Sequence, residues 1–382
     1  MTAMFIAPRS GPLVTEFTIA FDVRLKCIAR MSDCSGMHSH HLSYLPLSAL
    51  VMSLVACGGG ESIDAPVQAQ ASAVGEPRAQ DALGIPQADR SAAAAATARS
   101  ADNACAGIRP FYWEIGNRDA RLASGSITSP DSTVVYKAST VMSIASATKW
   151  VYGAFVTQRN HGVLSADDLK YLSMRSGFMN MKYCVAGQTV DGCLNYQDNG
   201  AYTAEYDNEF FYNGGHMQEH ASLIGLGGLS SKALTAALKA QIGTDVKMAY
   251  SWPEIAAGIV TSADAYGRFL RKMMTGELLL GAMLGSNPVC TNPRTCAAGE
   301  ATRSPAPLSE TWHYSIGHWV EDDPEVGDGA FSSAGALGFY PWIDKSKQTY
   351  GIVARKGEAG TGTDSANCGR LIRMAWATGT AQ

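Results

Sequence analysis

The chain has 382 residues, with 30 lysines and arginines against 34 aspartates and glutamates, so its formal net charge is −4 at pH 7. It has no dense basic run, which argues against a nucleic-acid-binding surface. The first hundred residues are poor in aromatics and rich in alanine and serine, whereas residues 104–382 have the composition of a globular domain. That length fits one large domain, or one domain with an inserted lobe.

An apolar stretch at residues 45–56 has the length of a signal-peptide core and is too short to span a bilayer. It ends in the sequence LVAC at 54–57, which resembles the box before the lipidated cysteine of bacterial lipoproteins. We therefore expect residues 1–57 to be a leader, Cys57 to be lipidated, and the protein to be exported to the periplasm or cell envelope on a membrane tether. The alternative is a plain secretory signal in which Cys57 is incidental.

Residues 58–103 contain a glycine triplet, an alanine run and scattered prolines without a sustained apolar period. This pattern predicts a flexible tether between membrane and domain, with part of the alanine run transiently helical. The residues before Met37 fit neither kind of leader, so Met31 and Met37 are alternative translation starts.

Six cysteines follow the leader, and an even number in an exported chain favours disulfides. The predicted pairs are Cys184–Cys193, Cys290–Cys296 and Cys105–Cys368. No CxxC sequence occurs and no histidine lies at ligand spacing beside these cysteines, so we expect no metal and no other cofactor.

Strand patterns open the domain at 110–117 and 132–139, separated by the turn-rich residues 123–132. A helix is predicted over 146–160, because Val151, Ala154 and Phe155 fall on one side of it. Loops and short helices are expected over residues 163–230.

An amphipathic helix is predicted over 231–242, and residues 261–264 have the pattern of a helix N-cap with an acidic first turn. The last third alternates strand patterns, with a hairpin at 345–347, and a helix over 368–377 closes the chain. This order predicts an α+β fold of three layers, α/β/α, with an antiparallel sheet flanked by helices and an inserted, mostly helical lobe.

The sequence SATK at 146–149 is the only S-x-x-K match in the chain, and it lies at the start of the first long predicted helix. Three residues along a helix make nearly one turn, so Ser146 and Lys149 face the same side. A desolvated lysine can lose its proton and then accept that of the serine, while the helix N-terminus stabilises charge on an attacked carbonyl. The alternative is an N-cap serine followed by a solvated lysine.

The order of the motifs resembles that of the serine beta-lactamase and penicillin-binding-protein superfamily, in particular its beta-lactamase-related esterase and peptidase branch. The resembling segments after SATK are DDLKYLSMRSGF at 167–178, FFYNGGH at 210–216, AGIVTSAD through RF and TG at 257–276, and SAGA at 333–336. The resemblance covers about residues 108–378.

The resemblance implies that Ser146 is the acylated nucleophile, Lys149 its base, and Tyr212 the residue that delivers a proton to the leaving group. A core or loop aromatic is the alternative for Tyr212. Tyr206 competes for the same role, because Tyr206 and Asn208 form a literal Y-x-N.

The substrate-binding residues depart from the family pattern at two places. Gly214 stands where asparagine is usual, so Asn213 is the candidate for that amide, and Ser333 replaces a lysine or histidine that would grip a substrate carboxylate. The oxyanion hole would be the N–H groups of the nucleophile and of Ala336, with Gly335 letting the substrate approach the strand edge. The alternative for this last segment is an ordinary strand of small residues.

The sequence therefore predicts a monomeric, exported serine hydrolase that cleaves a small ester, amide or peptide through an acyl-enzyme. One alternative is a cell-wall D-peptide carboxypeptidase or a beta-lactamase, although the missing cation argues against efficient beta-lactam hydrolysis. The other is a tethered binding protein on the same fold with decayed catalysis. The chain contains neither the G-x-S-x-G sequence of an alpha/beta-hydrolase nor the H-E-x-x-H sequence of a zincin.

Overall fold

The computed structural model describes residues 84–358 and 360–382, so the predicted leader and Cys57 lie outside the described residues. The described residues belong to one compact unit. No helix among the described residues is long and apolar enough to cross a membrane.

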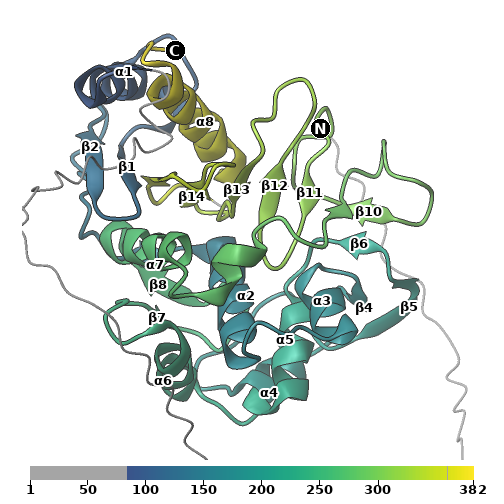
Figure 1. Ribbon diagram of the computed structural model, residues 1–382. Helices are drawn as coiled ribbons and strands as arrows, with labels where there is room; N and C mark the ends of the chain where they lie inside the picture. The colour runs from purple at the N-terminus through teal and green to yellow at the C-terminus, as the bar shows by residue number, and fades with distance from the viewer. Residues whose placement is uncertain (1–83, 359) are drawn as a thin grey trace, which may run out of the picture. The chain divides into compact units, whose positions relative to one another are not determined.

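The centre of the fold is an eight-stranded sheet in the order β2-β1-β15-β14-β13-β12-β11-β9 (Figure 1). All of its pairings are antiparallel, which confirms the predicted sheet. Its strands are β1 (Phe111–Asn117), β2 (Arg121–Ile127), β9 (Val289–Cys290), β11 (His313–Tyr314), β12 (Trp319–Glu321), β13 (Ala330–Ser332), β14 (Tyr340–Ile343) and β15 (Thr349–Ala354). The predicted hairpin at 345–347 joins β14 to β15.

Helices cover both faces of this sheet because alternate residues of β15 point to opposite sides. Val353 packs into the core that contains α8 (Gly362–Thr378), whereas Ile352 packs into the larger core that contains α7 (Ala263–Thr275). The result is the predicted arrangement of helices, sheet and helices.

The lobe between α2 (Thr148–Arg159) and α7 is mostly helical, as predicted. Its helices are α3 (Ala166–Leu172), α4 (Val190–Leu194), α5 (Gly215–Ala221) and α6 (Ser231–Ile242), the last with the predicted bounds. Among the described residues, three small sheets lie outside the main sheet. In the first, β8 (Ile259–Thr261) pairs with both β3 (Met142–Ser143) and β7 (Ala249–Tyr250). The other two pair β4 (Ser176–Phe178) with β5 (Tyr202–Asp207), and β6 (Phe210–Phe211) with β10 (Ala301–Arg303).

The predicted tether is wrong for part of its length, because α1 (Gln87–Arg99) is a packed helix of the domain. It lies beside α8, and its Ala94 and Ala98 are fully buried in the core beneath the two helices (Figure 1). Small side chains let two helices approach closely, so an alanine-rich face packs well. Such a helix lacks the periodic alternation of large apolar and polar residues by which a buried helix is predicted from sequence.

The first hairpin also differs from the prediction. The second strand is β2, which overlaps the first half of the segment expected to be a turn, while Val134 and Val135 of the expected strand are 47% and 45% exposed. Small residues in β2 give room to its neighbours: a Cβ on Gly125 would come within 2.9 Å of the Trp113 indole nitrogen.

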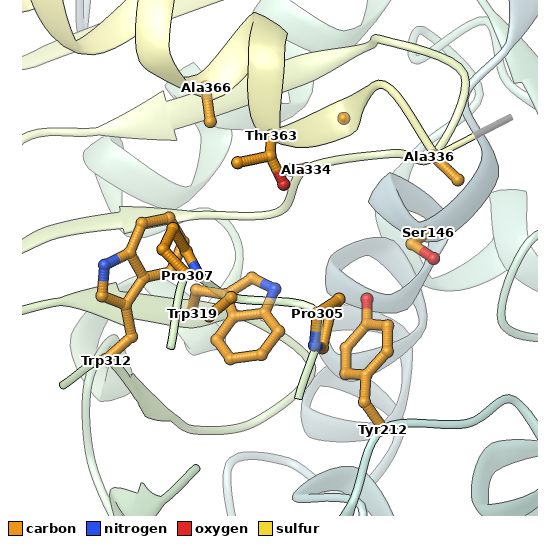
Figure 2. Close-up of a pocket in the computed structure, with 13 residues that line it drawn as sticks. Ser146, Tyr212, Pro305, Pro307, Trp312, Trp319, Ala334, Ala336, Thr363 and Ala366 are labelled. Carbon is orange, nitrogen blue, oxygen red and sulfur yellow. The ribbon is translucent and has the colours of Figure 1, made fainter. Parts of the chain in front are cut away.

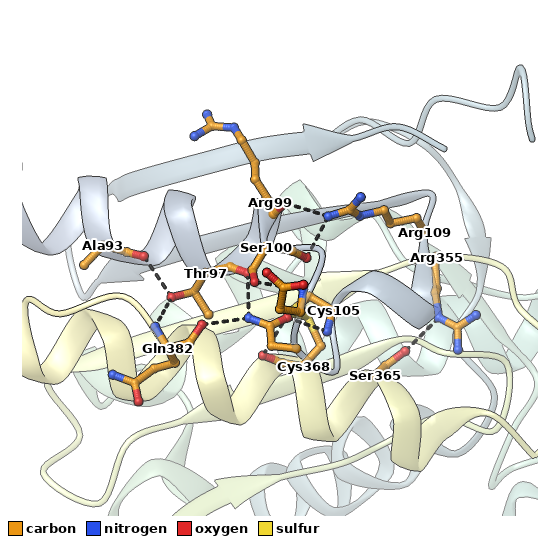
Figure 3. Close-up of a disulfide and its surroundings, with 12 residues drawn as sticks. Ala93, Thr97, Arg99, Ser100, Cys105, Arg109, Arg355, Ser365, Cys368 and Gln382 are labelled. Carbon is orange, nitrogen blue, oxygen red and sulfur yellow. Dashed lines mark hydrogen bonds between the residues drawn. A yellow bond between two sulfur atoms is a disulfide. The ribbon is translucent and has the colours of Figure 1, made fainter. Parts of the chain in front are cut away.

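All three predicted disulfides are present. Cys105–Cys368 ties the segment after α1 to α8, beside a set of hydrogen bonds that hold the C-terminus (Figure 3). There the Gln382 N–H donates to Thr97 Oγ1 at 2.9 Å, and the Asn103 amide donates to the Gln382 carbonyl at 2.8 Å. Both ends of the described chain are therefore fixed to one helical layer.

Candidate active site

Ser146 lies in the short 3₁₀ helix η3 (Ala145–Ala147), between β3 and the first turn of α2. The residue before it, Ala145, has φ 43°, in the left-handed region that alanine rarely adopts. Such backbone strain clusters at functional sites, and here it turns the chain sharply from strand to helix at the serine.

The structure brings together the three residues predicted to be catalytic. Lys149 Nζ donates to Ser146 Oγ at 3.0 Å and to the Ala256 carbonyl at 3.3 Å. The same nitrogen lies 4.8 Å from the centroid of the Tyr212 ring. Figure 2 shows the Tyr212 hydroxyl pointing toward the Ser146 side chain. Tyr206 lies on β5 with its ring near Phe211. It does not line the cavity that Ser146 and Tyr212 share.

Burial sets the ionisation of the two groups beside Ser146. Lys149 is 3% exposed, and desolvation lowers its pKa to about 8 although the nearby Glu254 carboxylate opposes the shift. Burial also raises the pKa of Tyr212 to about 12, with hydrogen bonding to Ser146 acting in the opposite direction. Near neutral pH Tyr212 therefore keeps its proton and can donate it. Lys149 loses its proton more readily than a solvent-exposed lysine does.

The segment that carries Tyr212 is held by its main chain. The Tyr212 N–H donates to the Arg303 carbonyl at 3.0 Å, which attaches it to β10. The Asn213 side chain accepts from the N–H groups of Met181 at 3.0 Å and Gly215 at 2.8 Å. Asn213 is therefore engaged with the backbone and does not line the cavity, contrary to its predicted place at the substrate.

The residues after β13 approach the nucleophile from the other side. Ser333 Oγ donates to the Ser146 carbonyl at 3.2 Å and does not line the cavity. A Cβ on Gly335 would lie 2.1 Å from the Ile144 carbonyl oxygen, so glycine is needed here for main-chain packing rather than for substrate approach. Ala336 lines the cavity together with Ser146, and within the described residues its N–H has no hydrogen-bond acceptor.

Comparison with known proteins finds no matching family model and no matching curated protein. Solved structures do match. The octameric penicillin-binding protein homologue from Pyrococcus abyssi superposes with a TM-score of 0.51 at 13% identity, covering 71% of this chain and 74% of that one. The D-amino acid amidase from Ochrobactrum anthropi SV3 has a TM-score of 0.50 at 11% identity, over 69% of this chain and 93% of that one.

A D-stereospecific amidohydrolase from Streptomyces sp. also matches, with a TM-score of 0.50 at 10% identity, over 74% of this chain and 98% of that one. The chain has the beta-lactamase and penicillin-binding-protein fold. The sequence resemblance is thus confirmed for the fold, and identities this low extend the likeness no further.

In this beta-lactamase-like domain, Ser146 opens into a cavity of ≈ 140 Å³ whose wall is mostly apolar (Figure 2). Its lining residues are Ser146, Tyr212, Pro305, Ala306, Pro307, Trp312, Trp319, Ala334, Ala336, Gly360, Gly362, Thr363 and Ala366. The Trp319 ring stacks on Tyr212 with the ring centroids 5.2 Å apart.

Sequence reasoning missed most of this wall. Trp319 falls inside a segment that was predicted as a strand, but nothing in the pattern shows which side of that strand faces the nucleophile. Residues 305–307 come from the loop between β10 and β11, which the Asn292 amide holds by donating to the Leu308 carbonyl at 3.1 Å. The Cys290–Cys296 disulfide links two residues of the segment that precedes β10 and this loop.

Proposed function

We propose that this protein is a serine hydrolase that cleaves an ester or amide bond through an acyl-enzyme on Ser146. The observation that carries the proposal is the 3.0 Å contact between Lys149 Nζ and Ser146 Oγ, in a site where burial lowers the lysine pKa to about 8. A base must lie within hydrogen-bond reach of the proton it takes and have a pKa near the working pH.

In the acylation step, Ser146 Oγ forms a bond to the substrate carbonyl carbon while its proton moves to Lys149 Nζ. The main-chain N–H groups of Ser146 and Ala336 stabilise the resulting oxyanion. The bond between the carbonyl carbon and the leaving group then breaks. Tyr212 donates its proton to the leaving atom and recovers one from the Lys149 ammonium.

In the deacylation step, a water molecule attacks the acyl carbon and gives a proton to the neutral Lys149. Collapse of this second oxyanion releases the carboxylic acid, and Ser146 Oγ recovers the proton. The cycle consumes one water for each ester or amide bond and needs no cofactor.

We also propose that the protein works outside the cytoplasm. Three disulfides support an oxidising compartment for the domain. Export, the membrane tether at Cys57 and the monomeric state remain proposals from the sequence. Of the alternatives, a decayed binding protein is disfavoured by the close approach of Ser146, Lys149 and Tyr212.

A fluorophosphonate probe tests the proposal, because an activated serine displaces fluoride from phosphorus and keeps the label. We expect labelling of the wild-type protein, loss of labelling in Ser146→Ala, and a fall in ester turnover of at least about 10³-fold in that variant. Ser309→Ala is the matched control, because Ser309 is exposed and belongs to the loop that borders the cavity. Equal labelling of wild type and Ser146→Ala would refute Ser146 as the nucleophile.

A further inference from the structure

We infer that the site takes substrates whose leaving group is uncharged and apolar, such as aryl esters or anilides, and discriminates against a carboxylate at that position. The inference rests on the proposed function and adds a substrate class to it. Its basis is the composition of the cavity wall and the contacts of the cations Lys149, Arg355 and Arg370.

The cavity continues from the catalytic residues into an aromatic wall. Trp319 stacks on Tyr212, and the Trp312 ring meets Trp319 edge-on with the centroids 5.8 Å apart. The two tryptophans are 3% and 4% exposed, so their rings are held in place by packing. In Figure 2 they line the cavity beside Pro305 and Pro307. Rigid aromatic surface of this kind binds apolar, preferably flat, groups.

No charged side chain lines the cavity within the described part of the chain. The Ser333 side chain is neutral, and its hydroxyl donates to the Ser146 carbonyl at 3.2 Å. Lys149 is buried behind the nucleophile and donates to Ser146 Oγ and a main-chain carbonyl. A carboxylate in the cavity would therefore lose water without gaining a charged partner.

Two further cations pack near the wall and are engaged elsewhere. Arg370 lies 5.0 Å from the centroid of Trp312, but it pairs with the carboxylates of Glu310 and Glu321. Arg355 donates to Ser365 Oγ at 2.9 Å on α8. The first turn of α8 also borders the cavity. The Asp364 carboxylate in that turn offsets the positive partial charge of the helix N-terminus.

The wall lies on the leaving-group side of the scissile bond. Tyr212 is the proposed proton donor to the leaving atom. The aromatic wall begins beside it, at the Trp319 ring that stacks on Tyr212. A leaving group whose first atom contacts the Tyr212 hydroxyl thus extends along Trp319 toward Trp312.

The test compares two phenyl acetates of similar size, the neutral 4-carbamoylphenyl acetate and the anionic 4-carboxyphenyl acetate. We expect kcat/KM for the neutral ester to be at least about tenfold higher, because the carboxylate would be desolvated without a partner. Fluorophosphonate labelling of Ser146 is measured in parallel, so that failure of the inference is separated from failure of the proposed function.

Two variants test the wall itself. Trp312→Ala is expected to lower kcat/KM for 2-naphthyl acetate about tenfold while changing that for ethyl acetate by less than about twofold. Leu308→Ala is the matched control, because Leu308 is 39% exposed and lies in the bordering loop without lining the cavity. Thr363→Lys places an ammonium at the cavity and should raise relative activity on the carboxylate ester about tenfold.

Equal or faster turnover of 4-carboxyphenyl acetate, with Ser146 still labelled, would overturn the inference and leave the proposed function standing. Absence of both labelling and turnover would overturn the two together. A Trp312→Ala variant that loses activity equally on both acetates would assign that tryptophan a structural role and contradict the wall as the source of specificity.

Discussion

Among single residues, Lys149 determines the pH range in which the proposed active site can accept the serine proton. Its ammonium is buried against Ser146, and desolvation lowers its pKa more than Glu254 raises it. The neutral amine that accepts the serine proton is thus populated from about pH 8 upward, while Tyr212, with a pKa of about 12, keeps its proton. One buried pair therefore supplies a base and an acid at the same pH.

The pH dependence of kcat/KM follows from this pair. Below pH 8 the base is protonated, so the rate should fall about tenfold for each pH unit, and it should level off above pH 8. Glu254→Gln removes the carboxylate that raises the Lys149 pKa, so the rising limb should move to lower pH. The control Glu205→Gln, an exposed carboxylate on β5, should leave the limb in place. A profile that is flat between pH 6 and 9 would contradict Lys149 as the base.

At the level of elements, α1 shows how the domain begins earlier than its composition suggests. Its alanines pack against α8, the helix that also carries Thr363 and Ala366 to the cavity. Because α1 consists mostly of alanine, large apolar residues do not recur along it at helical spacing. Only its packing against α8 shows which of its faces is buried. By contrast, α6 has a clear apolar face, and its bounds follow from the sequence.

Two alanines of α1 test its packing. Ala94 is fully buried and Ala96 is exposed, so leucine at the first position overfills the contact with the core while leucine at the second does not. We expect Ala94→Leu to lower the free energy of unfolding by about 1–3 kcal/mol and Ala96→Leu to change it by less than about 0.5 kcal/mol. Denaturant unfolding measures both. Equal, negligible effects would mean that α1 is part of a tether after all.

For the whole molecule, local patterns predicted more than distant ones. The spacing of Ser146 and Lys149 is nearly one helical turn, the hairpin at 345–347 is a local turn, and two of the three disulfides join cysteines 9 and 6 residues apart. The third, Cys105–Cys368, spans 263 residues and is the one pair that remains. Tyr212 could be proposed only through the family resemblance, because its approach to Ser146 depends on how β6 attaches to β10. The tryptophan wall could not be predicted, because Trp312 and Trp319 lie close together in sequence but nothing in that segment shows which of its side chains face Ser146 and Tyr212.

In the proposed mechanism, Ser146 carries the acyl group during turnover. Rapid acid quenching of the protein during hydrolysis of phenyl acetate, followed by peptide mass mapping, locates that group directly. We expect an acetyl group on the peptide that contains Ser146, and none on the same peptide of Ser146→Ala. An acetyl group on another residue, or undiminished turnover by Ser146→Ala, would contradict it.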